Sequence, residues 1–191
     1  MEIFSSSGKD PAKLWKCTRN VHRVYDRTVK GFVFLLEKGT ATQMSIPPEP
    51  SRESLGLVQP VLVMQLRLSP SKHTSLEIIV LDNKGNKRRM HLSSTFREFE
   101  CNDLHIQIPL RFEKEDRWVN LVLDLDEIIG NCFRGHKFQS IMYICIKPVC
   151  RLRKVFTLFQ AERHSRLSIP AMYEFPTGTN YTNIVRILYS A

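Results

Sequence analysis

The chain has 191 residues, which predicts one domain with a full hydrophobic core. Its 28 lysines and arginines outnumber its 19 aspartates and glutamates, so the formal net charge is +9. That charge indicates an acidic partner, such as nucleic acid, an anionic membrane or an acidic protein surface. The hydrophobic fraction of 42% is ordinary for a globular protein, and no apolar run reaches the roughly 18 residues of a membrane span.

The cysteines and the start of the sequence indicate an intracellular protein. The five cysteines are odd in number and include no Cys-x-x-Cys pair, unlike a secreted disulfide framework, so we expect reduced thiols. Residues 1–5 have no positively charged segment followed by a long apolar stretch, as a signal peptide would. We therefore expect the protein in the cytoplasm, without a membrane partner.

From the N-terminus onward, short β-like stretches alternate with turn-forming residues. Proline, glycine, serine and asparagine break the chain at 6–11, 47–50, 69–71 and 82–86. The asparagines and the glycine of 82–86 accept positive φ angles, so this turn is expected to close a β-hairpin. The predicted strands are residues 13–17, 31–36, 43–46, 61–68, 75–81, 87–92, 104–108, 117–123, 140–146 and 151–158.

Strands at this spacing predict an all-β domain over residues 1–159, folded as a β-sandwich or a barrel. Residues 160–191 do not continue the pattern, because they contain two prolines, a glycine and two short apolar groups at 169–173 and 184–189. We expect these residues to form a C-terminal extension that packs on the domain or on a partner.

One amphipathic helix is predicted after the strand at 117–123. Asp124 can accept hydrogen bonds from the free N–H groups of the first turn, Glu127 completes a capping box, and Gly135 is a suitable end. The apolar residues have the i, i+3, i+4, i+7, i+8 spacing of a helix packed on a core. They are Leu125, Ile128, Ile129, Cys132 and Phe133.

The strand predicted at 151–158 places fixed cations side by side. Side chains alternate along a strand, so two arginines two positions apart point the same way. In a chain without a catalytic motif, such cations favour binding to an acidic surface over bond-breaking chemistry. The expected faces are Arg151, Arg153 and Val155 on one side and Leu152, Lys154 and Phe156 on the other.

Two basic groups are the candidate binding residues. Lysine and arginine side chains on a strand face would steer the domain to an acidic surface and hold it there. The alternative is a solvated strand face, where cations discourage edge-to-edge aggregation. The candidates are Lys87, Arg88 and Arg89 in the first group and Lys147, Arg151, Arg153 and Lys154 in the second.

Cysteine and histidine pairs give a weaker indication of chemistry. Cys101/His105 and Cys132/His136 share an i, i+4 spacing. On a strand such residues are about 13 Å apart, so only the second pair, at the end of the helix, has the spacing of metal ligands. A buried thiol and a surface histidine explain the pair better, and no metal is expected.

Carboxylates and tryptophans also have simpler explanations. Asp124 and Asp126 could form a pair for glycoside hydrolysis, but capping and the helix dipole account for both. Trp15 and Trp118 could stack on sugars, although an inward tryptophan is the ordinary outcome in a strand. No phosphate-binding loop, Gly-x-Ser-x-Gly or His-Glu-x-x-His motif is present. We therefore predict no enzymatic activity and no cofactor.

Five groups of residues carry a resemblance to a known family. They are EIFS at 2–5 with GKDP at 8–11, LGL at 55–57 with LVM at 62–64, VLD at 80–82 with KRR at 87–89, WVNL at 118–121, and CRLRKVF at 150–156. In this order, over residues 2–158, the sequence resembles the cilia- and flagella-associated protein 20 domain family. LRKVFTL at 152–158 and KGFVF at 30–34 are closer to its longer domain-containing paralogue than to its small founding member.

The resemblance implies an antiparallel jelly-roll-like β-sandwich, similar in shape to carbohydrate-binding modules and without known catalysis. It also implies a structural protein of cilia or centrioles, in the axoneme or basal body, with tubulin, microtubules and neighbouring axonemal or centriolar proteins as partners. The seven candidate cations would then meet the acidic surface of tubulin. The alternative is a basic β-sandwich adaptor or nucleic-acid-binding module without a tubulin role, which the charge allows but no nucleic-acid motif supports.

Overall fold

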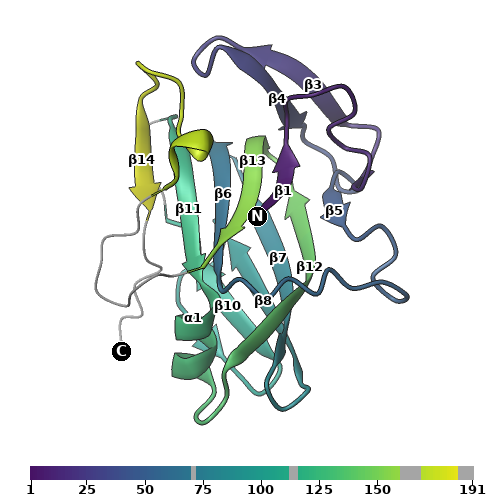
Figure 1. Ribbon diagram of the computed structural model, residues 1–191, viewed down its shortest axis with the longest axis vertical. Coiled ribbons are helices and arrows are strands. Elements are labelled where there is room, and N and C mark those ends of the chain that lie inside the picture. The colour runs from purple at the N-terminus through teal and green to yellow at the C-terminus, as the bar shows by residue number, and fades with distance from the viewer. Residues whose placement is uncertain (70–71, 112–115, 160–168, 185–191) are drawn as a thin grey trace.

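Two seven-stranded β-sheets pack face to face and enclose most of the hydrophobic core (Figure 1). The computed structural model describes residues 1–69, 72–111, 116–159 and 169–184. The first sheet has the order β14-β11-β6-β13-β4-β3, with β1 beside β13. Its strands are β1 (Glu2–Ser5), β3 (Val21–Asp26), β4 (Gly31–Leu36), β6 (Val61–Leu68), β11 (Trp118–Asp124), β13 (Cys150–Leu158) and β14 (Tyr181–Ile184).

The second sheet has the order β2-β5-β12-β7-β8-β10-β9. Within the described residues, neighbouring strands of both sheets are antiparallel, except for the parallel pairs β10–β8 and β11–β14. The fold is the expected β-sandwich with one short α-helix. The strands of the second sheet are β2 (Lys16–Cys17), β5 (Met44–Ile46), β7 (Ser75–Asp82), β8 (Lys87–Ser93), β9 (Glu100–Cys101), β10 (His105–Pro109) and β12 (Phe138–Lys147).

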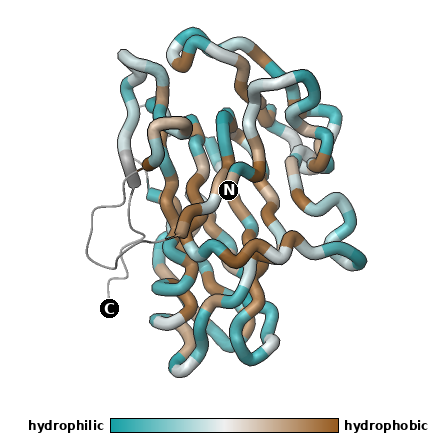
Figure 2. Tube along the Cα trace, in the orientation of Figure 1, coloured by the Kyte–Doolittle hydropathy of each residue, from teal (hydrophilic) through white to brown (hydrophobic). Residues whose placement is uncertain are grey.

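The main core lies between the sheets because their inner faces carry apolar side chains at every second position. In β7, Leu76, Ile78 and Val80 are fully buried, while the side chains between them are half-buried. Leu62 and Leu66 of β6 belong to the same core on the opposite sheet. Figure 2 shows hydrophobic residues concentrated in the central strands and hydrophilic residues in the loops at both ends of the molecule.

A second apolar layer covers the outer face of the first sheet. Tyr173 stacks on Phe156 of β13, with ring centroids 4.0 Å apart, and Phe175 packs on Trp118 of β11 at 5.8 Å. Both covering residues come from the C-terminal segment, where a 3-10 helix (Ala171–Tyr173) precedes β14. Residues 169–184 therefore pack on the sandwich, and β14 extends the first sheet beside β11. Residues 160–168 and 185–191, which include most of the apolar group at 184–189, lie outside the described residues.

The helix α1 (Leu125–Cys132) confirms the predicted cap and apolar stripe. The Asp124 carboxylate accepts a hydrogen bond from the Glu127 backbone N–H at 3.1 Å. Leu125, Ile128 and Ile129 are buried against the core. Within the described residues, no helix is long and apolar enough to cross a membrane.

Several strand predictions need correction. The strand expected at 13–17 is reduced to Lys16–Cys17, because residues 11–14 form a turn. Four strands were not predicted, namely β1, β3, β9 and β14. Three of the six side chains of β3 are exposed and β9 has two residues, so neither has the apolar alternation that identifies a half-buried strand. β14 is polar in sequence and depends on pairing with the distant β11. The hairpin predicted at 82–86 is confirmed by the antiparallel β7–β8 pair.

The expected faces of β13 are wrong beyond Arg153, because a β-bulge interrupts the alternation. Leu152 pairs with Leu66 and Lys154 pairs with Gln65, so β13 has one residue more than β6 between these pairs. Arg151 and Arg153 do share the outer face, as predicted, but Lys154 also lies outside. The two apolar residues that follow change sides as a result: Val155 packs in the inner core and Phe156 in the outer layer.

Candidate functional site

The seven candidate cations lie in three separate places. Arg151, Arg153 and Lys154 are on the outer face of the first sheet, while Arg89 and Lys147 are on the outer face of the second. Arg88 is buried near the start of β8, and Lys87 is exposed beside it. The structure therefore does not join the predicted residues into one continuous basic surface.

Arg151 is part of an ion-pair cluster around a buried carboxylate. Its Nη1 lies 2.5 Å from Oδ2 of Asp26, and Nη1 of Arg67 lies 3.4 Å from the same oxygen. The Asp26 side chain is almost fully buried at the end of β3. Burial opposes ionisation, but the hydrogen bonds from Thr28 and Arg151 outweigh it and lower the pKa of Asp26. Arg151 therefore fastens β13 to the β3–β4 hairpin.

Arg153 and Lys154 contact the C-terminal segment. Nη1 of Arg153 donates to Oε1 of Gln65 at 2.5 Å, and its guanidinium lies 5.4 Å from the Phe175 ring centroid. Burial lowers the pKa of Arg153. Nζ of Lys154 lies 2.9 Å from Oε2 of Glu2 and 5.3 Å from the ring centroid of Tyr173. Both cations therefore help to hold the outer apolar layer in place.

A buried polar group links Arg153 to the same layer. Nε2 of Gln65 donates to the carbonyl oxygen of Tyr173 at 2.6 Å and to Oδ1 of Asn120 at 3.1 Å. Gln65 is fully buried, so these contacts satisfy its amide inside the protein. The surroundings of Arg153 are those of a structural residue.

On the second sheet, two candidates meet a glutamate. Nε of Arg89 lies 3.1 Å from Oε1 of Glu77, and Nζ of Lys147 lies 3.6 Å from its Oε2. The two cationic side chains are 52% and 39% exposed. Two positive charges share one negative charge here, so this face keeps a positive excess that a partner can reach.

Arg88 has a structural place. Its Nε lies 2.9 Å from Oδ2 of the buried Asp82, and its guanidinium lies 4.0 Å from the Phe133 ring centroid. Nδ1 of His136 lies 2.7 Å from the same Asp82 oxygen. Burial raises the pKa of Asp82, but hydrogen bonds from Asn86 and His136 outweigh it and leave that pKa well below its usual value. This cluster closes the end of the sandwich near α1.

The metal-ligand pairs and the tryptophans have structural surroundings. His136 faces Asp82, while the Cys101 thiol lies 3.8 Å from the Cys132 carbonyl oxygen. No group of three or more histidine, cysteine or acidic residues that could hold a metal is found in the described part of the chain. Trp15 and Trp118 are both buried, as expected.

The β3–β4 hairpin carries an exposed basic and aromatic surface that was not predicted from the sequence. Tyr25 and Phe32 are 58% and 48% exposed and meet edge to face, with centroids 5.7 Å apart. The Arg23 guanidinium lies 4.5 Å from the Phe32 ring centroid, in cation–π range. The signal in the sequence is the alternation of Arg23 and Tyr25 just before the strand predicted at 31–36.

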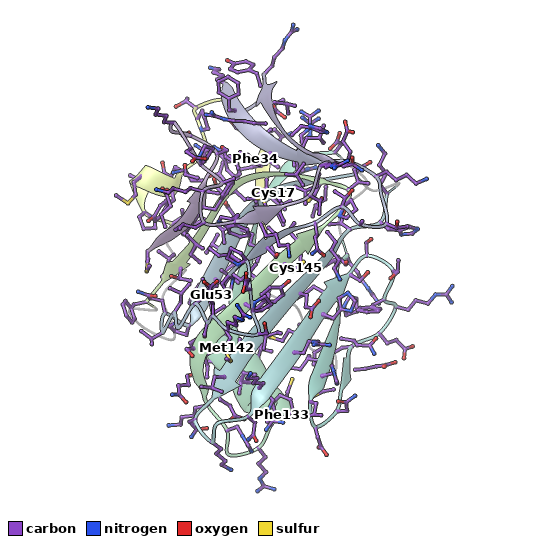
Figure 3. All side chains as sticks on the ribbon, turned by 90° about the vertical axis from the view of Figure 1, so that its right-hand side faces the viewer. Cys17, Phe34, Glu53, Phe133, Met142 and Cys145 are labelled. Carbon is purple, nitrogen blue, oxygen red and sulfur yellow. The ribbon has the colours of Figure 1, made fainter. Side chains whose placement is uncertain are left out.

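The hairpin lies far from the Arg88 cluster. Figure 1 shows β3 and β4 at the upper end of the molecule and α1 at the lower end. Figure 3, viewed from the side, shows Phe34 of β4 near the upper end and Phe133, just after α1, near the lower end. The hairpin surface and the Arg88 cluster therefore lie toward opposite ends of the molecule.

Comparison with known proteins gives a match over most of the chain. The model of a family described as the CFA20 domain matches residues 1–175. Cilia- and flagella-associated protein 20 of Paramecium tetraurelia is 23% identical over 178 residues, which cover 91% of this chain and 90% of that protein. The protein of the same name from Chlamydomonas reinhardtii is 22% identical, with 91% and 90% covered, and that from Caenorhabditis briggsae is 21% identical, with 91% and 85% covered.

Among solved structures, a chain described as "Structural analysis of an exo-beta-agarase" aligns with a TM-score of 0.44 and 10% identity. The alignment covers 85% of this chain but spans only 25% of that solved chain.

Proposed function

The chain belongs to the CFA20 domain family, and from this membership we propose that it is a non-enzymatic structural protein of cilia or flagella that binds microtubules. The observation that carries the proposal is the extent of the match. The family model covers residues 1–175, and three relatives named cilia- and flagella-associated protein 20 align over 85–90% of their own lengths. We place the protein in the axoneme, basal body or centriole, beside neighbouring structural proteins.

The charge of the chain supports a microtubule contact, because the tubulin surface and its glutamate-rich tails are acidic. A net charge of +9 steers the protein toward such a surface and holds it there. Among the predicted cations, Lys87, Arg89 and Lys147 remain accessible, whereas Arg151 and Arg153 are engaged within the domain. We therefore assign the microtubule contact to the second sheet and its β7–β8 hairpin.

Such a contact is weak per site, because an exposed ion pair contributes only about 0–1 kcal/mol. Stable residence then needs several contacts at once, to tubulin and to a neighbouring protein or the next copy along the protofilament. Repeated weak contacts gain affinity through effective concentration. For free tubulin dimers, which offer a single weak electrostatic site, we expect a dissociation constant of roughly micromolar or weaker. On assembled microtubules, which offer many such sites, we expect the protein to be retained much more tightly.

Co-sedimentation with stabilised microtubules tests the proposal. Binding should fall steeply as salt rises, and the double variant Arg89→Glu, Lys147→Glu should sediment less than the wild-type protein. The double variant Arg27→Glu, Lys30→Glu makes the same charge change at exposed positions in the turn between β3 and β4 of the first sheet and serves as a matched control. Binding that is insensitive to salt would contradict an electrostatic contact. Pull-downs with duplex DNA and RNA at equal salt test the alternative of a nucleic-acid-binding module.

A further inference from the structure

Within the described residues, the β3 strand is an open edge of the first sheet. The strand order ends at β3, so β3 pairs with β4 on one side and offers the backbone groups of its other side to a partner. An exposed edge of this kind is a template for an additional strand. β3 spans six residues, Val21–Asp26, which is a usual length for pairing with an extended peptide.

One face of this edge is aromatic and exposed. Tyr25 pairs directly with Phe32, and Arg23 pairs with Phe34, so these four side chains share a face. Phe34 is buried in the main core, whereas Tyr25 and Phe32 are exposed. The face is therefore a continuation of the core-facing side of the sheet that the second sheet does not cover. Two adjacent exposed rings at such a place indicate an interaction surface.

The opposite face holds the hairpin firmly. Val24 and Val33 pack with Trp118 and Phe175 in an outer apolar cluster. At the end of β3, the buried Asp26 is fixed by Arg67 and Arg151, as described above. The exposed rings are thus presented by a strand that is anchored on its other side, which lowers the entropy lost when a ligand binds.

The charge of the hairpin selects the ligand. The exposed cations of residues 19–32 are Arg19, Arg23, Arg27 and Lys30, and the acidic residue of this range, Asp26, is buried on the opposite face. The Arg23 guanidinium lies over the Phe32 ring, and because a guanidinium has five N–H donors it can still meet a carboxylate.

From these contacts, we propose that the open edge and exposed face of the β3–β4 hairpin bind an acidic, extended peptide segment of a partner protein by β-strand addition. In this arrangement, a glutamate or aspartate of the peptide lies beside Arg23, and an apolar side chain two positions away packs on Tyr25 and Phe32. The site goes beyond the proposed function, because its ligand chemistry holds whether or not the protein binds microtubules.

Two other roles for these residues are less consistent with the structure. Cations on an edge strand discourage aggregation, but this role does not call for two exposed aromatic rings. Single-stranded nucleic acid stacks on aromatic residues among cations, but its binding does not require the backbone groups of an open strand edge. A peptide uses the charge, the rings and the edge together.

Fluorescence anisotropy on the full chain tests the site. The probe is a short labelled peptide with glutamate, phenylalanine and glutamate at every second position and serine between them. Arg23→Glu and Phe32→Ser should each weaken binding by about tenfold or more, as expected for one lost charged or aromatic contact. Arg134→Glu, the same charge change at an exposed site after α1, should bind like the wild-type protein. Equal loss in Arg134→Glu would overturn the site.

Two modified probes separate the parts of the proposal. A peptide with lysine in place of glutamate should not bind, and a peptide N-methylated at alternate residues should bind about tenfold more weakly, because it cannot donate to the strand edge. Undiminished binding of the methylated peptide would overturn strand addition. Tighter binding of a single-stranded RNA than of the acidic peptide would overturn the ligand class.

Two further measurements check whether the variants still fold and whether they self-associate. Arg23→Gln removes the charge with little change of shape, so it keeps the test valid if Arg23→Glu unfolds the chain. Analytical ultracentrifugation measures the oligomeric state and so tests the alternative role of the cations, which is to discourage edge-to-edge aggregation. If Arg23→Glu forms oligomers while its peptide affinity is unchanged, the cations protect the edge and the proposed site is wrong.

Discussion

Arg151 of β13 and Arg23 of β3 carry the same charge on neighbouring parts of one sheet, but they have different partners. Arg151 lies 2.5 Å from the buried Asp26, whereas Arg23 stacks on the exposed Phe32. The first is occupied in holding the fold together, and the second is available to a ligand. The difference shows that a cation paired with a buried carboxylate serves the fold, whereas a cation on an exposed face can meet a partner.

The largest expected effect comes from removing the cover of the first sheet. A chain that ends at Leu158 would expose Phe156 and Trp118, which Tyr173 and Phe175 cover. We expect a loss of about 3–6 kcal/mol in unfolding free energy, from about 1.5–3 kcal/mol for each buried aromatic side chain. Urea denaturation measures it. If the truncated chain were as stable as the full one, the contacts of Arg153 and Lys154 with this segment would contribute nothing to the stability of the fold.

Asp26→Ala tests the internal side of the comparison. It leaves Arg67 and Arg151 without their shared carboxylate, and we expect a loss of about 3 kcal/mol, at the low end for a broken buried ion pair because both arginines retain some solvent contact. Arg27→Ala, next in sequence but exposed, is the control and should change stability little. Similar melting curves for the two variants would show that Arg151 does not stabilise the fold through Asp26, and so that it does not differ from Arg23 in this respect.

The pH dependence of stability gives a third test. The pKa values of Asp26 and Asp82 are lowered from the ordinary 3.8 on folding. Their contribution is therefore complete above the unfolded pKa and is lost as the pH falls through the lower folded pKa values. We expect a stability plateau near neutral pH and a decline below about pH 4, with a shallower decline in Asp82→Asn. Urea melts at a series of pH values measure both slopes, and parallel slopes would contradict the assignment to Asp82.

The smallest expected effect is on the exposed face of the hairpin. Tyr25→Ser and Arg27→Ala should change unfolding free energy by less than about 0.5 kcal/mol, because both side chains are exposed. Thermal melts of both variants check this. A large loss in either would show that the hairpin surface belongs to the fold rather than to a ligand.

The sequence was sufficient to predict the elements whose structure is decided by a local pattern of residues. β4 and β6 have the predicted bounds because most of their residues are apolar and turns flank them, and α1 follows from Asp124 and its apolar stripe. The sequence was insufficient to predict the side-chain orientation where one extra residue shifts the pairing of two strands. The extra residue at Arg153 leaves the composition of β13 unchanged, so the side of Val155 depends on pairing with β6.

The candidate site could be predicted only in part, for a related reason. The cations themselves are visible in the sequence, but their partners are distant: Arg151 and Asp26 are separated by 125 positions. The exposure of Tyr25 and Phe32 depends on where the second sheet ends relative to the first. No local pattern contains that information, and an alternating strand reads the same whether its apolar side is covered or open.

The bulge in β13 also has a use in comparing related sequences. Around it, the outward residues Arg151, Arg153 and Lys154 are charged, and farther along the strand the outward residues Phe156 and Leu158 are apolar. A homologue that lacks one residue between positions 152 and 155 would turn the residue at 156 inward. Such a homologue should then show no aromatic residue equivalent to Tyr173, so a gap at one position of an alignment predicts a substitution in another segment.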